Sequence, residues 1–141
     1  MYGEISEVQL TEMIRRHKKW LNGELEGSRL DLTGYPVIKN VNITFCDLSR
    51  AILDGVIFEN VNISGTSFRN ASCQRIQFIN VNATSADFEG ADLRYAKLDF
   101  TPHSYLINLV NADLNGAEYD NNILKDLRQS RNDNEKKCCV Y

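Results

Sequence analysis

The sequence lacks long hydrophobic runs: no more than four apolar residues follow one another anywhere in its 141 residues. A transmembrane helix needs about 20, and Met1–Glu4 shows neither a basic start nor the apolar core of a signal peptide. We therefore expect a cytoplasmic protein with no membrane partner. The mixture of 43% apolar and 25% charged residues is that of one globular domain, which excludes disorder of the whole chain.

Residues suited to catalysis or metal binding are scarce. Of the two histidines, His17 is expected to pack in a helix, and His103 has no partner at catalytic spacing. The sequence contains no phosphate-binding loop, nucleophile elbow or zinc-protease motif. The four cysteines, Cys46, Cys73, Cys138 and Cys139, form no C-x-x-C pattern and are interpreted as free thiols. We therefore predict a protein that is not an enzyme and uses no cofactor or metal.

The two tail cysteines allow one alternative. Lys136–Tyr141 formally satisfies the C-a-a-X prenylation pattern, with a lysine pair before Cys138 and Cys139. Tyrosine is a poor final residue for that modification. The tail is therefore interpreted as an unmodified polar segment.

Positive charge is also in short supply. The chain has 16 Lys and Arg against 19 Asp and Glu, with a pI of about 5.4. A protein that binds nucleic acid by displacing phosphate counterions needs the opposite balance, so direct nucleic-acid binding is excluded. The charge is uneven, because residues 41–82 have three acids and three bases, whereas residues 83–126 have eight acids and three bases.

The sequence contains a repeat with two periods. The segments that begin at Asn40, Asn60 and Asn80 read Asn-Val-Asn-Ile-Thr, Asn-Val-Asn-Ile-Ser and Asn-Val-Asn-Ala-Thr, 20 residues apart. Within them, residues 41–100 divide into twelve gapless units of five, each with a mostly small residue followed two positions later by a generally larger apolar one. After an interruption at Thr101–Leu106, the pattern resumes from Ile107 to Leu124.

A period of five suits neither a single helix nor a straight strand, since it smears the apolar face of the first and flips that of the second. It predicts a coil that turns every five residues, with four sides in each 20-residue turn and the coils stacked as a solenoid. Phe58, Phe68, Phe78 and Phe88 then fill the interior and leave no central pocket. Two sets of stacked asparagines are expected to form amide ladders: Asn40, Asn60 and Asn80, and Asn42, Asn62 and Asn82.

The unit motif indicates a family. Ala86–Gly90, Ala91–Tyr95 and Ala112–Gly116 each begin Ala-Asp followed by Phe or Leu. They are three of sixteen five-residue units that stand in register between about residues 30 and 126. This pattern resembles the pentapeptide-repeat family. The resemblance implies an all-β solenoid, a right-handed quadrilateral β-helix of about four to five coils.

The ends of a solenoid need caps, because they expose unpaired backbone and apolar surface. Leu10, Ile14, His17 and Leu21 recur at helical spacing, with Thr11 expected as the N-cap and Gly23 as the stop. Trp20 and Leu21 are expected to cover the first coil, an arrangement that resembles the capping helix of bacterial and phage members of the family. We divide the chain into a cap (1–29), the β-helix (30–126, with one extra residue at Pro36) and a polar tail (127–141).

The acidic half of the rod is the candidate binding site. Its residues are Asp87, Glu89, Asp92, Asp99, Asp113, Glu118 and Asp120. Some pentapeptide-repeat proteins, including the gyrase-protecting quinolone-resistance group, are DNA mimics. The resemblance therefore implies a DNA-mimic inhibitor of a nucleic-acid-binding enzyme or defence complex, of the anti-restriction, anti-CRISPR or topoisomerase-modulating type. The chain is shorter than that group and lacks its projecting loops, so no particular target follows.

Two alternatives stay open at this stage. The acids can simply keep a repetitive β protein soluble. The rod can also be a structural scaffold that binds protein partners through outward apolar residues, for which the candidates are Phe45, Ile52, Ile57, Ile79 and Phe100. The sequence leaves the oligomeric state open, a homodimer included.

Overall fold

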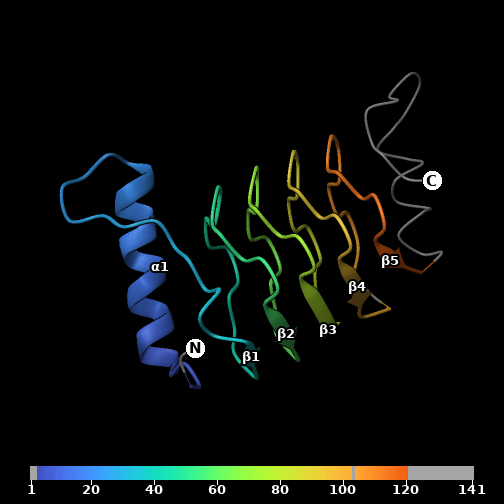
Figure 1. The fold of residues 1–141 in the computed structure, drawn as a ribbon, viewed down its shortest axis with the longest axis horizontal. Coiled ribbons are helices and arrows are strands. Elements are labelled where there is room, and N and C mark those ends of the chain that lie inside the picture. The colour runs from blue at the N-terminus through green and yellow to red at the C-terminus, as the bar shows by residue number, and fades with distance from the viewer. Residues whose placement is uncertain (1–2, 103, 121–141) are drawn as a thin grey trace.

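The computed structural model describes residues 3–102 and 104–120. It contains one helix, α1 (Glu7–Leu21), followed by five short strands in one parallel sheet: β1 (Val37–Lys39), β2 (Ile57–Glu59), β3 (Gln77–Val81), β4 (Lys97–Phe100) and β5 (Glu118–Tyr119). Each strand pairs with the next one along the chain. The chain therefore winds as a parallel β-solenoid of about four coils, with α1 beside the first coil (Figure 1).

Each coil has four sides. Side 1 is formed by the strands. The other three are marked by columns of single parallel β-bridges: Asn42, Asn62 and Asn82 on side 2; Asp47, Ser67, Asp87 and Asn108 on side 3; and Asp31, Ile52, Ser72, Asp92 and Asp113 on side 4. The quadrilateral coil predicted from the period of five is thus confirmed.

The corners between sides are made by residues with left-handed backbone. Their φ values are positive at Asn40, Phe45, Arg50, Gly55, Asn60, Gly65, Asn70, Arg75, Asn80, Ser85, Gly90, Tyr95, Leu106, Asn111 and Gly116. Asparagine and glycine dominate this set because they adopt that conformation at the lowest cost. The corner position is the last residue of each five-residue unit, which is why the chain turns at that interval.

Aromatic rings fill the interior as predicted. Phe58, Phe68, Phe78 and Phe88 are fully buried. Phe58 stacks on Phe78 with ring centroids 5.6 Å apart, and Phe68 stacks on Phe88 at 4.8 Å. Neighbouring coils therefore share one continuous apolar core, which also encloses the hydroxyl of Thr66.

Of the two expected asparagine ladders, one is confirmed. The Asn80 amide donates to Asn60 Oδ1 at 2.8 Å, and the Asn60 amide to Asn40 at 3.5 Å. The second prediction was wrong. Asn62 and Asn82 instead accept bonds from the backbone N–H and hydroxyl of the residue two positions later, which closes each turn locally.

Two coils contain an extra residue, as predicted near Pro36 and after residue 100. Asp31 pairs with Ile52 and Asp87 with Asn108, both 21 positions apart, whereas Val37 pairs with Ile57 at the regular 20. The register also changes before the second insertion: Ile79 pairs with Asp99 at the regular 20, but Val81 pairs with Phe100 only 19 positions later. The chain is therefore one residue short at Phe100, and it gains two residues before Asn108, which pairs with Asp87 at 21.

The predicted outward position of Phe100 was wrong. This residue was expected to point outward, but it is only 6% exposed and its ring lies 5.3 Å from that of Phe78. The register shift moves Phe100 into the inward column that contains Val81. It therefore belongs to the core and is removed from the candidate apolar surface.

The helix is longer than expected at its start. Its N-cap is Ser6 and not Thr11: the Ser6 hydroxyl accepts from the backbone N–H of Gln9, and the Gln9 side chain accepts from the backbone N–H of Ser6. This capping box satisfies two N–H groups that would otherwise lack partners. Gly23 ends the helix as predicted, with a φ of 72°. None of the described residues forms a helix long and apolar enough to cross a bilayer.

Candidate interaction surface

The seven acidic candidates all lie on the later coils, away from α1, but they occupy three different sides. Asp87 and Glu89 are on side 3, Asp92 and Asp113 on side 4, and Asp99, Glu118 and Asp120 at the end of side 1. The structure thus divides the candidate site into three groups. Their charge environments differ.

The group on side 3 is partly neutralised by an arginine of the preceding coil. The guanidinium of Arg69 lies 2.6 Å from Glu89 and 3.4 Å from Asp87. The side-chain amide of Asn108, from the following coil, donates to Asp87 at 3.0 Å and to Glu89 at 3.2 Å. These two carboxylates therefore have partners inside the fold and connect three successive coils.

The group on side 4 is also compensated. Arg94 donates to Asp92 through two nitrogens, at 2.9 and 2.8 Å, and lies 3.8 Å from Asp113 on the next coil. These bonds from Arg94 lower the pKa of the Asp92 carboxyl, and a bond from the Gln74 amide adds to the effect. Asp92 stacks on Asp113 of the next coil, and these two like charges repel each other. Arg94 offsets this repulsion, so this pair does not require an external cation.

The group on side 1 differs from the other two. The pairing of Lys97 with Glu118 and of Leu98 with Tyr119 places Asp99 one coil from Asp120. Asp99 accepts a bond of 3.3 Å from the backbone N–H of Asn80. Within residues 3–102 and 104–120, neither Asp99 nor Glu118 forms an ion pair.

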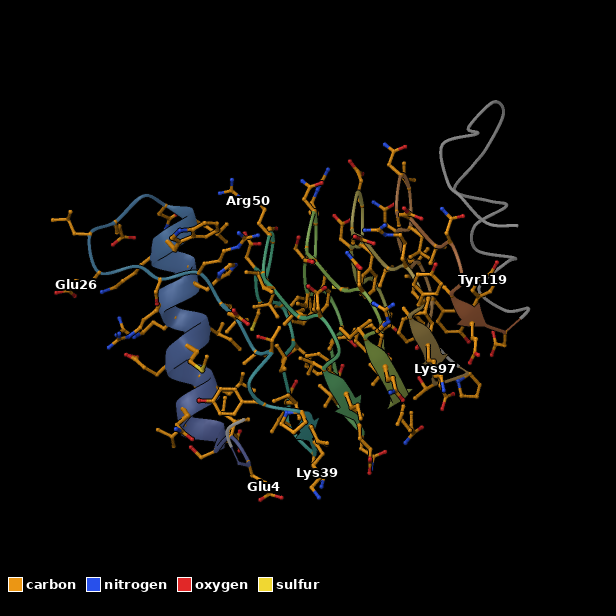
Figure 2. All side chains as sticks on the ribbon, viewed as in Figure 1. Glu4, Glu26, Lys39, Arg50, Lys97 and Tyr119 are labelled. Atoms are coloured by element: carbon orange, nitrogen blue, oxygen red, sulfur yellow. The ribbon has the colours of Figure 1, made fainter. Side chains whose placement is uncertain are left out.

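These side 1 acids border a shallow depression of about 510 Å³. Its lining also includes Ile79 and Lys97, and Figure 2 shows Lys97 and Tyr119 at this end of the stack. Ile79 is 37% exposed. An open depression that is bordered by three acids and also lined by apolar residues suits a contact with a cationic protein surface better than the enclosure of a small molecule.

The alternative apolar residues do not form one surface. Phe45, at the corner between sides 2 and 3, is 82% exposed, whereas Ile52 on side 4 and Ile57 on side 1 are partly buried. Ile57 and Ile79 share side 1, so only these two can contribute to a common contact.

Cysteine chemistry does not point to a reactive site in the described residues. Cys73 is fully buried, and burial raises the pKa of its thiol well above the ordinary value. Burial also raises the pKa of Cys46, whose thiol lies 3.5 Å from the carbonyl oxygen of Thr44. Both are free thiols, as predicted, and the buried Cys73 packs as a small apolar residue. The tail with Cys138 and Cys139 lies outside the described residues.

Comparison with known families agrees with this geometry. The family model for pentapeptide repeats matches residues 38–72 and 71–101, in eight copies. The chain belongs to the pentapeptide-repeat family. The matched residues are the stacked coils described above.

Two solved structures resemble this pentapeptide-repeat protein. One is a trypsin-treated variant of QnrB1, a plasmid-mediated fluoroquinolone resistance protein, with 22% identity, a TM-score of 0.39, and coverage of 65% of this chain and 61% of that one. The other is the pentapeptide repeat protein Rfr23 from the cyanobacterium Cyanothece 51142, with 32% identity, a TM-score of 0.33, and coverage of 61% and 58%. The chain thus matches about three fifths of the length of each. The search of curated proteins finds no significant match.

Sequence reasoning missed the internal counterions of this pentapeptide-repeat protein. Arg69 stands 20 residues before Glu89, and Arg94 stands two residues after Asp92. Because the coil period is 20, the first spacing was a usable signal: it places Arg69 directly beside Glu89 on the next coil. A charge count along the sequence does not contain that information, since it ignores which charges stack.

Proposed function

We propose that this pentapeptide-repeat protein is a non-enzymatic interaction module that inhibits a nucleic-acid-binding enzyme or defence complex by occupying its cationic site. The observation that supports this proposal is the acidic end of side 1, where Asp99 and Glu118 have no arginine partner among the described residues, whereas Asp87, Glu89, Asp92 and Asp113 have one. The binding surface is Asp99, Glu118 and Asp120, with Ile79 at its edge. Asp87, Glu89, Asp92 and Asp113 supply a weaker, partly neutralised field around it.

The physical basis is the spacing of the coils. Neighbouring parallel strands lie about 4.8 Å apart, so carboxylates that stack on adjacent coils repel each other. A partner that places Lys or Arg side chains against side 1 removes this repulsion on binding. Opposite charge also accelerates the encounter at low salt. A cationic groove that normally holds phosphates has these properties, which makes the rod a DNA mimic.

A scaffold that binds through apolar contacts is the second candidate. The observation that favours it is Phe45, a phenylalanine that is 82% exposed. Salt separates the two candidates, because an electrostatic complex weakens steeply as ionic strength rises whereas an apolar interface does not.

The test compares two variants with the same change in charge. One carries Asp99→Asn, Glu118→Gln and Asp120→Asn on side 1; the matched control carries Asp87→Asn, Glu89→Gln and Asp92→Asn. Each is used to capture partners from cells that encode the chain, over a salt series and with duplex DNA as competitor. We expect nucleic-acid-binding proteins that duplex DNA displaces, a loss of capture of tenfold or more for the side 1 variant, and a smaller loss for the control.

Two results would contradict the proposal. Equal losses for both variants would show that only the total charge matters, not side 1. Unchanged capture by the side 1 variant across the salt range would favour the second candidate, a scaffold that binds through apolar contacts.

A further inference from the structure

One buried titratable group joins α1 to the coils. His17 is 0% exposed, and both of its ring nitrogens are occupied. The backbone N–H of Leu30 donates to Nδ1 at 2.9 Å, and Nε2 lies 2.8 Å from the carbonyl oxygen of Ser49. Since Nδ1 accepts a bond from a backbone N–H, the ring proton must be on Nε2, where it donates to Ser49. The neutral ring therefore fits this position in one tautomer.

Charged groups surround this ring unevenly. The Trp20 ring stacks on His17 with centroids 5.4 Å apart, and the guanidinium carbons of Arg29 and Arg50 lie 5.4 and 4.8 Å from the Trp20 centroid. Arg50 occupies the corner nearest α1 in Figure 2. Burial lowers the pKa of His17 most strongly; the Ser49 carbonyl and Asp47 oppose the shift, and Arg29 and Arg50 add to it.

Protonation of the His17 ring removes the hydrogen bond between His17 and Leu30 and creates no new one. A proton on Nδ1 would face the N–H of Leu30, so two donors would meet and the Leu30 N–H would lose its acceptor. The resulting cation would be buried near two guanidinium groups, with Asp47 as the carboxylate that acts on it. Both effects oppose the packing of α1 against the first coil.

We propose that His17 is a proton-sensitive latch that holds α1 on the first coil at neutral pH and releases the helix at acidic pH. Protonation of His17 would weaken only the contacts that α1 and its flanking segments make with the first coil. The residues in these contacts are Leu30, Ser49 and the α1 residues Leu10, Met13 and Ile14. The coils beyond the first are held by their own backbone bonds. Release would therefore leave the stack folded and expose its first coil.

The sign of the pH dependence follows from the lowered pKa of the docked state. A free histidine titrates near pH 6.5, so below that value the released state takes up the proton first. The equilibrium constant for docking of α1 on the first coil is largest above about pH 6.5. It falls by up to tenfold for each pH unit below that value, until the docked ring is also protonated. Released molecules with an open first coil are expected to associate end to end.

The experiment is hydrogen exchange of the full chain between pH 7.5 and 5, corrected for intrinsic exchange and read by mass spectrometry. We expect protection of residues 7–21 to fall by up to tenfold per pH unit below 6.5, while residues 57–82 stay protected. The only tryptophan in the chain, Trp20, should change its fluorescence over the same range. Constant protection of α1, or simultaneous opening of α1 and the coils, would overturn the proposal.

Two variants separate His17 from other titrating groups. His17→Gln removes the titration, so its α1 protection should not vary with pH whatever its absolute level; a retained dependence would overturn the proposal. His103→Gln leaves His17 as the only histidine. Its ring proton resonances should then titrate with the same midpoint as α1 opening, and a midpoint that differs by more than one pH unit would refute the latch.

Discussion

Single residues at the corners determine how closely the coils can stack. Phe45 and Tyr95 both have left-handed backbone, and each side chain lies over a glycine of the next coil. A Cβ atom added at Gly65 would lie 2.5 Å from the Phe45 ring, and one at Gly116 would lie 2.4 Å from the Tyr95 ring. Glycine is therefore required at these corners for space as well as for its positive φ.

Gly65→Ala and Gly55→Ala separate these two requirements. Both glycines have positive φ, at 68° and 74°, but a Cβ at Gly55 would meet nothing within 4 Å. We expect Gly55→Ala to lower the free energy of unfolding by about 1 to 2 kcal/mol, the cost of alanine in left-handed backbone. Gly65→Ala should cost up to about 1 kcal/mol more than Gly55→Ala, because it also displaces the mostly exposed ring of Phe45. Urea denaturation measures both, and equal losses would contradict the packing role of Phe45.

The reassignment of Phe100 can be tested in the same way. Phe100→Ala should lower the free energy of unfolding by about 3 to 5 kcal/mol, as expected for a buried phenylalanine that leaves a cavity. Phe45→Ala should cost less than about 1 kcal/mol because its ring is mostly in solvent. If the two variants unfold at the same denaturant concentration, Phe100 is not part of the core.

At the scale of elements, α1 is joined to the coils by close backbone contact as well as by His17. A Cβ at Gly27 would lie 2.3 Å from the Trp20 backbone nitrogen, so the segment after the helix runs directly against it. The backbone N–H of Ser28 donates to the Arg16 carbonyl at 3.1 Å. The helix and the segment that follows it therefore form one unit on the first coil.

Deletion of residues 1–24 removes the helix of this unit. We expect the truncated chain to self-associate, because the first coil then exposes apolar side chains and unpaired strand backbone. The coils should keep their geometry, since each is held mainly by its neighbours. Light scattering measures association, and circular dichroism checks the coils. A truncated chain that stays monomeric and equally stable would show that α1 is not a cap.

At the scale of the whole molecule, each strand of side 1 pairs with the strands of the neighbouring coils, as in other stacked-repeat folds. Stability is then approximately a sum of coil and interface contributions, and the central coils have two interfaces each. The stacked Phe58, Phe68, Phe78 and Phe88 rings lie in this central region. The first and last coils of the described residues each have one interface with another coil instead of two.

Native-state hydrogen exchange at pH 7.5 should show this gradient. We expect the slowest exchange for backbone amides between residues 57 and 82, and faster exchange for those of β1 and α1. A uniform exchange rate across all coils would indicate that the stack unfolds as one unit, in which case the additive description is wrong.

The sequence by itself determined the repeat, because a residue's inward or outward position depends on its place in a five-residue unit. Phe58, Phe68, Phe78 and Phe88 could be placed in the core from the period alone, and the extra residue near Pro36 could be located by counting. The 20-residue period, with one extra residue after residue 100, likewise places Asp92 one coil before Asp113. These are local properties, fixed by spacing along the chain.

Only the tertiary structure decided what depends on neighbouring coils. The change of register after Asp99 could fall at several residues, and the structure places it where Phe100 turns inward and contacts Phe78. Whether an acid is free to bind a partner depends on which cations the fold places against it, on the same coil or on a neighbouring one. Arg94 therefore removes Asp92 and Asp113 from the strongest candidates and leaves Asp99 among them. The role of His17 depends on bonds to residues 13 and 32 positions away, which no local pattern encodes.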